Sequence, residues 1–91
     1  AGIGGRIADM VGKRLKDLSV RHQILCITHL PQIAAYGDRH FVVEKKVVSG
    51  RTLTAIRELK AEERVEELAR MLGGAMITDI TIKRAREMLQ L

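Results

Sequence analysis

The fifteen residues ILCITHLPQIAAYGD, from Ile24 to Asp38, decide the fold expected for this chain. The run from Gln23 to Thr28 is short, apolar and rich in β-branched residues, which is typical of a strand covered on both faces, as in a parallel sheet. Pro31 suits the first turn of a helix, because its missing N–H would have no partner there in any case. We therefore predict a strand at Gln23 to Thr28, followed by a short helix that starts at Pro31 and ends near Gly37.

Outside this stretch, hydrophobic spacing predicts a helix before it and a β-hairpin after it. Apolar residues recur every three or four positions from Gly5 to Ser19, which is the pattern of an amphipathic helix. Two extended segments, His40 to Val48 and Arg51 to Leu59, flank Ser49 and Gly50. A two-residue loop of this kind closes hairpins, so we predict two antiparallel strands here.

The C-terminal third is predicted to hold two more helices. Helical spacing runs from Glu62 to Leu72, and Gly73 is placed to end that helix. Thr81 is the predicted N-cap of a last helix. The residues that this last helix is expected to bury are Ile82, Ala85, Met88 and Leu89. The predicted fold class is α/β, with one parallel-type strand plus a β-hairpin and flanking helices.

The single parallel-type strand has no neighbour of its own kind in the sequence. Parallel strands are joined by crossovers of about a dozen residues or more, and only the segment from Gln23 to Thr28 has the required character. The chain also opens on AGIGG, without a methionine, and passes directly into a helical pattern. We therefore expect residues 1–91 to form a single, incomplete domain that is part of something longer.

Charge and composition narrow the classes of partner. Sixteen basic and eleven acidic residues give a net charge of +5, which favours polyanions but is spread along the chain. One Tyr, one Phe and no Trp argue against single-strand binding by stacking, while contact with duplex phosphates stays possible. Solvated helix and hairpin faces are the simpler interpretation. The basic groups are Lys13, Arg14, Lys16 and Arg21; Lys45, Lys46 and Arg51; and Lys83, Arg84 and Arg86.

Cysteine and hydropathy indicate a reducing, cytoplasmic setting. Cys26 is the only cysteine, so the chain cannot build a disulfide framework, and its place in the predicted strand makes it a core side chain. No apolar run reaches the roughly 18 residues that span a bilayer, and no signal-peptide pattern opens the chain. We expect no membrane association.

His29 is the strongest candidate for chemistry. It follows the predicted strand, and ligands of open α/β sheets bind beyond the carboxyl ends of strands. There its imidazole could donate a hydrogen bond to a phosphate oxygen and stabilise the charge that develops as a phosphoryl group leaves. The alternative is a histidine that ends a strand and bonds a loop. His22 and His40 lack zinc spacing and are predicted to be solvated.

The glycine cluster from Gly2 to Gly5 is a second candidate, because glycines before a helix can cradle an anion at the helix N-terminus. A tight turn is the simpler alternative. No Walker A loop is present, since Ile7 stands where the first glycine of that motif should be and Arg14 follows Lys13.

Several stretches together carry a family resemblance. AGIGGRIADMVGKRL, HQILCITHLPQIAAYGDRHFVVEK, RTLTAIREL and ERVEELARMLGG resemble the C-terminal end of the bacterial DNA repair ATPases of the SMC-like, ABC-type branch, and the resemblance covers essentially all 91 residues. It implies the C-terminal part of a P-loop ABC-type ATPase head that is split by a long coiled coil. It also implies that His29 is the switch histidine that senses the γ-phosphate of ATP. Gly2, Ile3, Gly4 and Gly5 match the loop after the Walker B pair, which reaches across a head dimer toward the second nucleotide.

The same resemblance implies what would lie elsewhere. The Walker A loop, the coiled-coil arms, the signature motif and the Walker B Asp-Glu pair would precede Ala1, so ATP and Mg²⁺ are expected in the full-length protein and neither is expected for this segment alone. The segment by itself should not hydrolyse ATP. Expected partners are the rest of the head, a second head in a homodimer, and double-stranded DNA ends during double-strand break repair and recombination. The expected location is the cytoplasm, in association with the nucleoid.

Two other functions remain open at this point. The chain could be a free-standing basic module that binds DNA or protein without catalysis, with its hairpin and last helices gripping duplex phosphates. A weaker alternative is a metal-dependent hydrolase that uses His22, His29 and His40.

Overall fold

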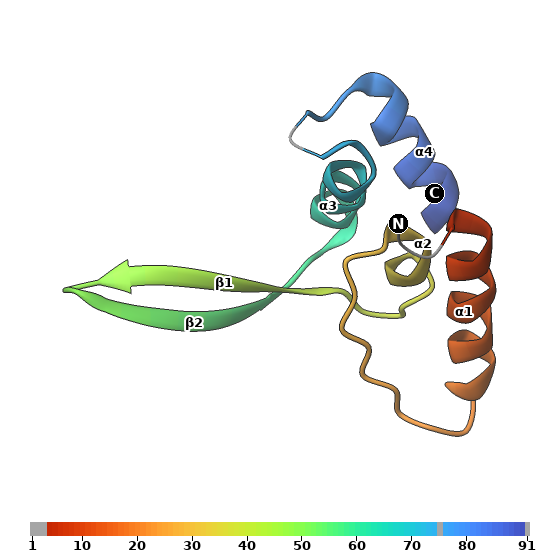
Figure 1. Cartoon of the computed structure of the whole chain (residues 1–91), viewed down its shortest axis with the longest axis horizontal. Coiled ribbons are helices and arrows are strands. Elements are labelled where there is room, and N and C mark those ends of the chain that lie inside the picture. Colours follow the sequence, from red (N-terminus) through yellow and green to blue (C-terminus); the bar gives the residue numbers. More distant parts are fainter. Residues whose placement is uncertain (1–3, 75, 91) are drawn as a thin grey trace.

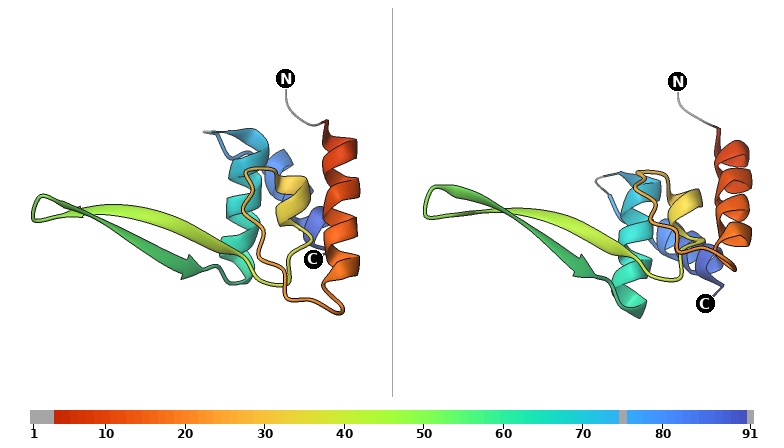
Figure 2. Two further views of the ribbon diagram at one scale, coloured as in Figure 1. Left: turned by 60° about the horizontal axis from the view of Figure 1, so that its bottom comes forward. Right: turned by 90° about the horizontal axis from the view of Figure 1, so that it is seen from below.

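The computed structural model describes residues 4–74 and 76–90, and that part holds four helices and one two-stranded antiparallel sheet (Figure 1). The helices gather at one end, and the hairpin projects away from them in every view (Figures 1 and 2). None of the described helices is long and apolar enough to cross a membrane. In chain order the elements are α1 (Gly5–Leu18), α2 (Pro31–Ala34), β1 (Phe41–Val48), β2 (Arg51–Glu58), α3 (Ala61–Gly73) and α4 (Asp79–Leu89).

The core lies between α3 and α4. Helical spacing places Val65, Leu68 and Ala69 of α3 on one stripe, and all three are fully buried, as is Ala85 of α4. Half-buried side chains from α2 and the residue after it, and from α3 and α4, surround this cluster. They are Ala34, Ala35, Met71, Leu72, Ile82 and Leu89. Of the four residues that the last helix was predicted to bury, Ala85 is buried, whereas Ile82, Met88 and Leu89 are only half-buried. In the described part of the chain, no residue of the sheet belongs to this cluster or to the side chains packed against it.

The start of α4 differs from the prediction. The N-cap is Thr78, whose side chain accepts a hydrogen bond from the backbone N–H of Thr81, with 3.2 Å between the two atoms. Thr81 returns the contact, because its hydroxyl oxygen accepts from the backbone N–H of Thr78 at 2.9 Å. The prediction that Thr81 is the N-cap is wrong: a second threonine three residues earlier completes a reciprocal pair, so the helix begins earlier.

α1 and α2 pack through a glycine. Gly12 is buried, and a Cβ atom added to it would lie 2.5 Å from a ring carbon of Tyr36, just after α2. The Tyr36 hydroxyl donates a hydrogen bond to the Asp9 carboxylate at 2.8 Å. The predicted starts of α1 at Gly5 and of α2 at Pro31 are confirmed.

The hairpin follows its prediction closely. Ser49 and Gly50 have positive φ angles of 50° and 76°, which suits a primed two-residue turn. The predicted strands extended one residue further, to His40 and Leu59, and the Leu59 N–H still donates to the His40 carbonyl at 2.8 Å.

The segment from Gln23 to Thr28 is not a strand, so the prediction of a parallel-type strand is wrong for this structure. It has no regular secondary structure, and Leu25 and Ile27 are 87% and 94% exposed. Cys26 is exposed too, so its predicted burial is also wrong. The physical reason is that a strand forms only against a neighbour, and the two strands in the described part of the chain pair with each other.

Candidate functional site

His29 lies in a bend between the apolar segment and α2, and its side chain is exposed. The turn is held locally, because the hydroxyl oxygen of Thr28 accepts a hydrogen bond from the backbone N–H of Leu30 at 3.0 Å. Leu30 is in turn the N-cap residue of α2. The residues from Thr28 to Pro31 therefore form a short turn that leads into α2. His29 is exposed to solvent in this turn, although no strand precedes it.

The predicted glycine site is only partly described. Gly2 and Ile3 lie outside the described residues, whereas Gly4 is the N-cap of α1 and Gly5 is its first residue. The first turn of α1 contains no acidic side chain, so no side-chain carboxylate there offsets the positive end of the helix dipole.

The start of α1 approaches the start of α2. A Cβ atom added to Gly5 would lie 3.3 Å from the side-chain nitrogen of Gln32, the second residue of α2. Gln32 follows His29 by three positions. The structure thus brings the described end of the predicted glycine site beside the helix that begins directly after the His29 turn.

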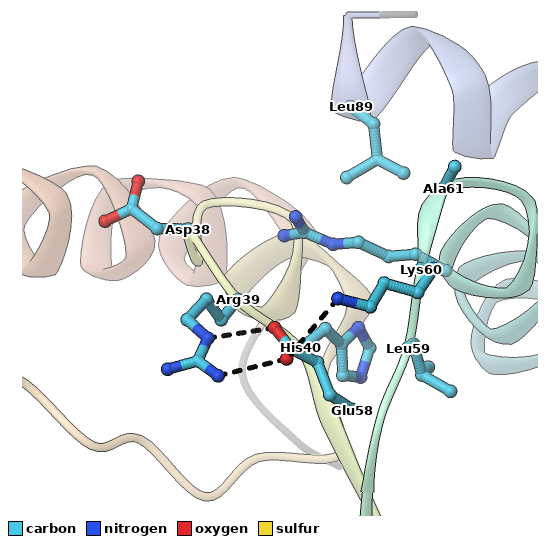
Figure 3. Close-up of a pocket in the computed structure, with 9 residues that line it drawn as sticks. Asp38, Arg39, His40, Glu58, Leu59, Lys60, Ala61 and Leu89 are labelled. Carbon is cyan, nitrogen blue, oxygen red and sulfur yellow. Dashed lines mark hydrogen bonds and ion pairs between the residues drawn. The ribbon is translucent and has the colours of Figure 1, made fainter.

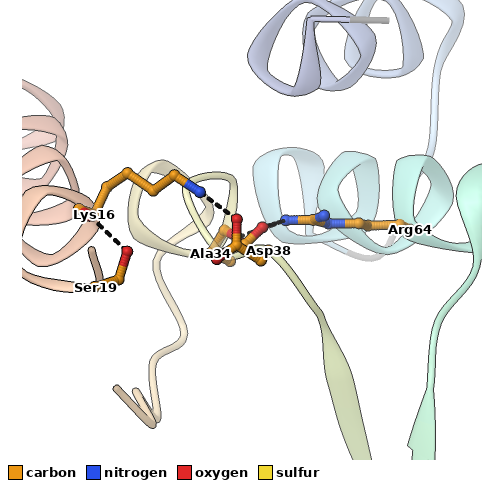
Figure 4. A network of polar contacts seen from close by, with 6 residues as sticks. Lys16, Ser19, Ala34, Asp38 and Arg64 are labelled. Carbon is orange, nitrogen blue, oxygen red and sulfur yellow. Dashed lines mark hydrogen bonds and ion pairs between the residues drawn. The ribbon is translucent and has the colours of Figure 1, made fainter. Parts of the chain in front are cut away.

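A polar network ties the far end of α2 to α1 and α3 (Figure 4). Nη2 of Arg64, on α3, donates hydrogen bonds to the backbone carbonyls of Ala34, at 3.2 Å, and Gly37. Lys16 of α1 forms an ion pair with Asp38, and this hydrogen bond and charge lower the pKa of the Asp38 carboxyl. Carbonyls at the end of a helix lack partners within it, so these contacts hold α2 in place.

A hollow of about 250 Å³ opens where the hairpin meets the helices (Figure 3). Arg39 grips Glu58 with two hydrogen bonds of 2.8 and 3.0 Å, and Lys60 lies 3.8 Å from the same carboxylate. Arg39 also lies over the ring of Phe41, 4.9 Å from its centre. The residues that line the hollow are Asp38, Arg39, His40, Glu58, Leu59, Lys60, Ala61, Arg64 and Leu89.

His40 is half-buried in this hollow, so the prediction that it is solvated is wrong. Burial lowers the pKa of its imidazole, the positive charge of Arg64 lowers it further, and Glu67 opposes the shift. In the described part of the chain, Nδ1 of His40 and Nε of Arg64 have no hydrogen-bond partner. Residue spacing carries no signal for this hollow, because its residues meet only once β1 and β2 pair and bring the segment before β1 beside the segment that leads into α3.

The charged side chains that line the hollow interact with groups of this chain. Arg39 and Lys60 share Glu58, while Arg64 reaches toward α2. We therefore interpret the hollow as the contact region between the base of the hairpin and the helices.

The three histidines are not brought together. Among residues 4–74 and 76–90, no group of three or more His, Cys, Asp or Glu side chains could hold a metal ion. The three-histidine metal site considered for a hydrolase is therefore not formed.

Comparison with known proteins gives a consistent result. No family model matches the chain. It is 47% identical over 90 residues to the DNA repair protein RecN of Halalkalibacterium halodurans and 50% identical over 90 residues to that of Haemophilus influenzae. It is also 51% identical over 89 residues to RecN of Xylella fastidiosa strain 9a5c. These matches cover 98% to 99% of this chain but only 16% of each relative, so the chain spans about a sixth of their length.

Proposed function

Because the chain belongs to the RecN family of DNA repair proteins and matches a C-terminal segment of them, we propose that it is the C-terminal part of an SMC-like, ABC-type ATPase head. In a protein of full length, ATP would close two such heads and its hydrolysis would reopen them. This cycle would couple the nucleotide state to engagement of DNA ends during double-strand break repair.

His29 and the glycine segment are this chain's share of the proposed ATP site. The imidazole of His29 would donate a hydrogen bond to an oxygen of the γ-phosphate, where negative charge develops during phosphoryl transfer. The segment from Gly2 to Gly5 would approach the nucleotide held by the second head. Residues outside this chain would hold Mg²⁺ and activate water.

The observation that carries the proposal is the exposed apolar segment that leads directly into His29. Leu25 and Ile27 are 87% and 94% exposed, although their segment has the composition of a strand buried on both faces. A sheet contributed by the rest of a head would cover these side chains. His29 would then lie beyond the carboxyl end of the strand, where ligands of open α/β sheets bind.

The test uses a full-length RecN protein that carries this segment. We expect His29→Ala to lower the rate of ATP hydrolysis by about 100-fold, the typical effect of removing one donor to developing negative charge, while ATP binding changes little. His22→Ala is the matched control, because His22 is also exposed but precedes the apolar segment. Hydrolysis that is equally fast in the His29 variant and the control would refute the proposed role of His29.

A further inference from the structure

The outer half of the hairpin, residues 45–54, lies on the part of the molecule that projects from the helices, and it is basic. We refer to it as the distal hairpin. It carries Lys45, Lys46 and Arg51 and no Asp or Glu. All three cations are exposed, and none forms an ion pair within the part of the chain that the structure describes. The distal hairpin also points away from the helices (Figures 1 and 2), so another molecule can approach it from several sides.

At the root of the same hairpin, where the strands meet the helices, the basic side chains are paired with acidic ones. Arg39 is paired with Glu58 at 2.8 Å, and Arg57 is paired with Glu44 at 3.2 Å and with Glu63 of α3. Each arginine at the root thus has an acidic partner from this chain. The two halves belong to one hairpin, but only the cations of the distal hairpin lack an acidic partner in the described part of the chain.

Both faces of the distal hairpin carry positive charge. Residues paired across the strands share a face, and neighbouring residues along a strand alternate between faces. The register pairs Lys45 with Thr54, and it pairs Lys46 with Leu53 and Val48 with Arg51. Lys45 therefore lies on one face, whereas Lys46 and Arg51 lie on the other, because position 48 shares a face with position 46.

This two-sided arrangement suits a groove lined by phosphates on both walls. The major groove of B-form DNA admits a two-stranded β-ribbon, and phosphates flank that groove on both sides. A flat anionic surface would meet only one face of the ribbon. Single-stranded DNA is disfavoured because the distal hairpin has no aromatic side chain on which bases could stack.

We propose that the distal hairpin enters a groove of duplex DNA, with Lys45 contacting phosphates on one wall and Lys46 and Arg51 contacting phosphates on the other. The inference rests on the proposed role at DNA and adds the surface that makes the contact. It differs from a free-standing binding module, because three phosphate contacts are too few for tight binding by this segment alone.

The test measures duplex affinity of a full-length RecN protein that carries this segment, without nucleotide. The hairpin variant is Lys45→Gln, Lys46→Gln and Arg51→Gln. The matched control is Lys13→Gln, Arg14→Gln and Lys83→Gln, which removes the same number of lysines and arginines from exposed positions on α1 and α4. The probe is a blunt, fluorescently labelled duplex of about 30 base pairs, titrated between about 50 and about 200 mM salt.

We expect the hairpin variant to bind more weakly at low salt and to depend less on salt. Each phosphate contact contributes about 0.9 to the slope of log affinity against log salt, so losing three contacts lowers that slope by about 2.7. Across the fourfold change in salt, the parent should then lose about 40-fold more of its affinity than the hairpin variant does. The control should keep the slope of the parent.

The outcome is separable from that of the ATP site, because DNA binding is measured without nucleotide and the hairpin variant should keep the basal rate of ATP hydrolysis. An unchanged salt slope in the hairpin variant, or an equal change in the control, would overturn the proposal. So would an unchanged duplex affinity together with lost binding to phosphatidylserine vesicles, which would assign the surface to a membrane. Circular dichroism of both variants verifies that they fold like the parent.

Discussion

The helix α3 and the segment from Gln23 to Thr28 are both rich in apolar residues, yet one is buried and the other is not. Leu68 of α3 is fully buried, while Leu25 of the segment is 87% exposed. The difference lies in what each pattern needs. An apolar stripe on a helix is covered by one neighbouring helix, here α4, whereas a parallel-type strand needs backbone partners at its edges and cover on both faces.

An exposed ion pair also joins α3 and α4 at the edge of their contact. Arg86 of α4 makes two hydrogen bonds to the Glu62 carboxylate of α3, with distances of 2.9 and 2.6 Å. These contacts lower the pKa of Glu62. The helices α3 and α4 thus bury their apolar side chains within this chain, whereas the apolar segment from Gln23 to Thr28 does not.

The largest expected effect comes from truncating a leucine on each side of this comparison. Leu68→Ala should lower the free energy of unfolding of the 91-residue chain by about 2 to 5 kcal/mol, because it removes buried methyl groups and leaves a cavity. Leu25→Ala should change it by less than about 0.5 kcal/mol, since the side chain is already in solvent. Urea unfolding followed by circular dichroism measures both values.

If Leu68→Ala does not fold, Leu68→Met tests the same position. This swap conserves the side-chain volume, so it should lower the free energy of unfolding by less than about 1.5 kcal/mol. Equal losses from Leu68→Ala and Leu25→Ala would mean that the apolar segment is buried in solution, and the comparison would fail.

A smaller effect is expected where α1 meets α2. In Gly12→Ala the new methyl group would lie 2.5 Å from the ring of Tyr36 and 3.2 Å from the backbone carbonyl of Gln32. Overpacking of this kind costs about 1 to 3 kcal/mol, and the better helix propensity of alanine returns about 1 kcal/mol. We therefore expect the free energy of unfolding of the chain, measured with urea, to fall by about 1 kcal/mol.

The double variant Gly12→Ala, Tyr36→Ala is the control for this contact. Removing the ring should relieve the closest contact of the added methyl group and leave only the one with the Gln32 carbonyl, so the two changes should be coupled in a double-mutant cycle. If the effects simply add, then the methyl group and the ring do not meet and α1 packs differently.

Local signals predicted most of the fold. Pro31 as a helix start and Ser49-Gly50 as a two-residue turn depend on backbone geometry that neighbouring residues determine, and both predictions are confirmed. The strand at Gln23 to Thr28 depends on partners far away or outside the chain, so its composition alone could not produce it.

The role of His29 stays a prediction. The structure shows only that His29 lies in an exposed turn directly before α2, without the strand that was expected to precede it. The burial of His40 could not be predicted, because it depends on Arg64 of α3 and on the pairing of the two strands, which brings His40 beside Leu59. Contacts between residues so distant in sequence leave no periodic signal.

His40, at the boundary between the self-contained helices and the hairpin, gives the smallest expected effect. Burial and the charge of Arg64 lower the pKa of its imidazole in the folded chain below the ordinary value of 6.5. The unfolded chain therefore binds the proton first as the pH falls below that value, so the stabilisation present above pH 6.5 is lost as the pH approaches the folded pKa. Urea unfolding between about pH 7.5 and about pH 5.5 should show a shallow decline in the parent and a flatter profile in His40→Gln. His22→Gln should keep the decline of the parent, and a parent whose stability does not change across this window would show that the hairpin root does not bury His40 in solution.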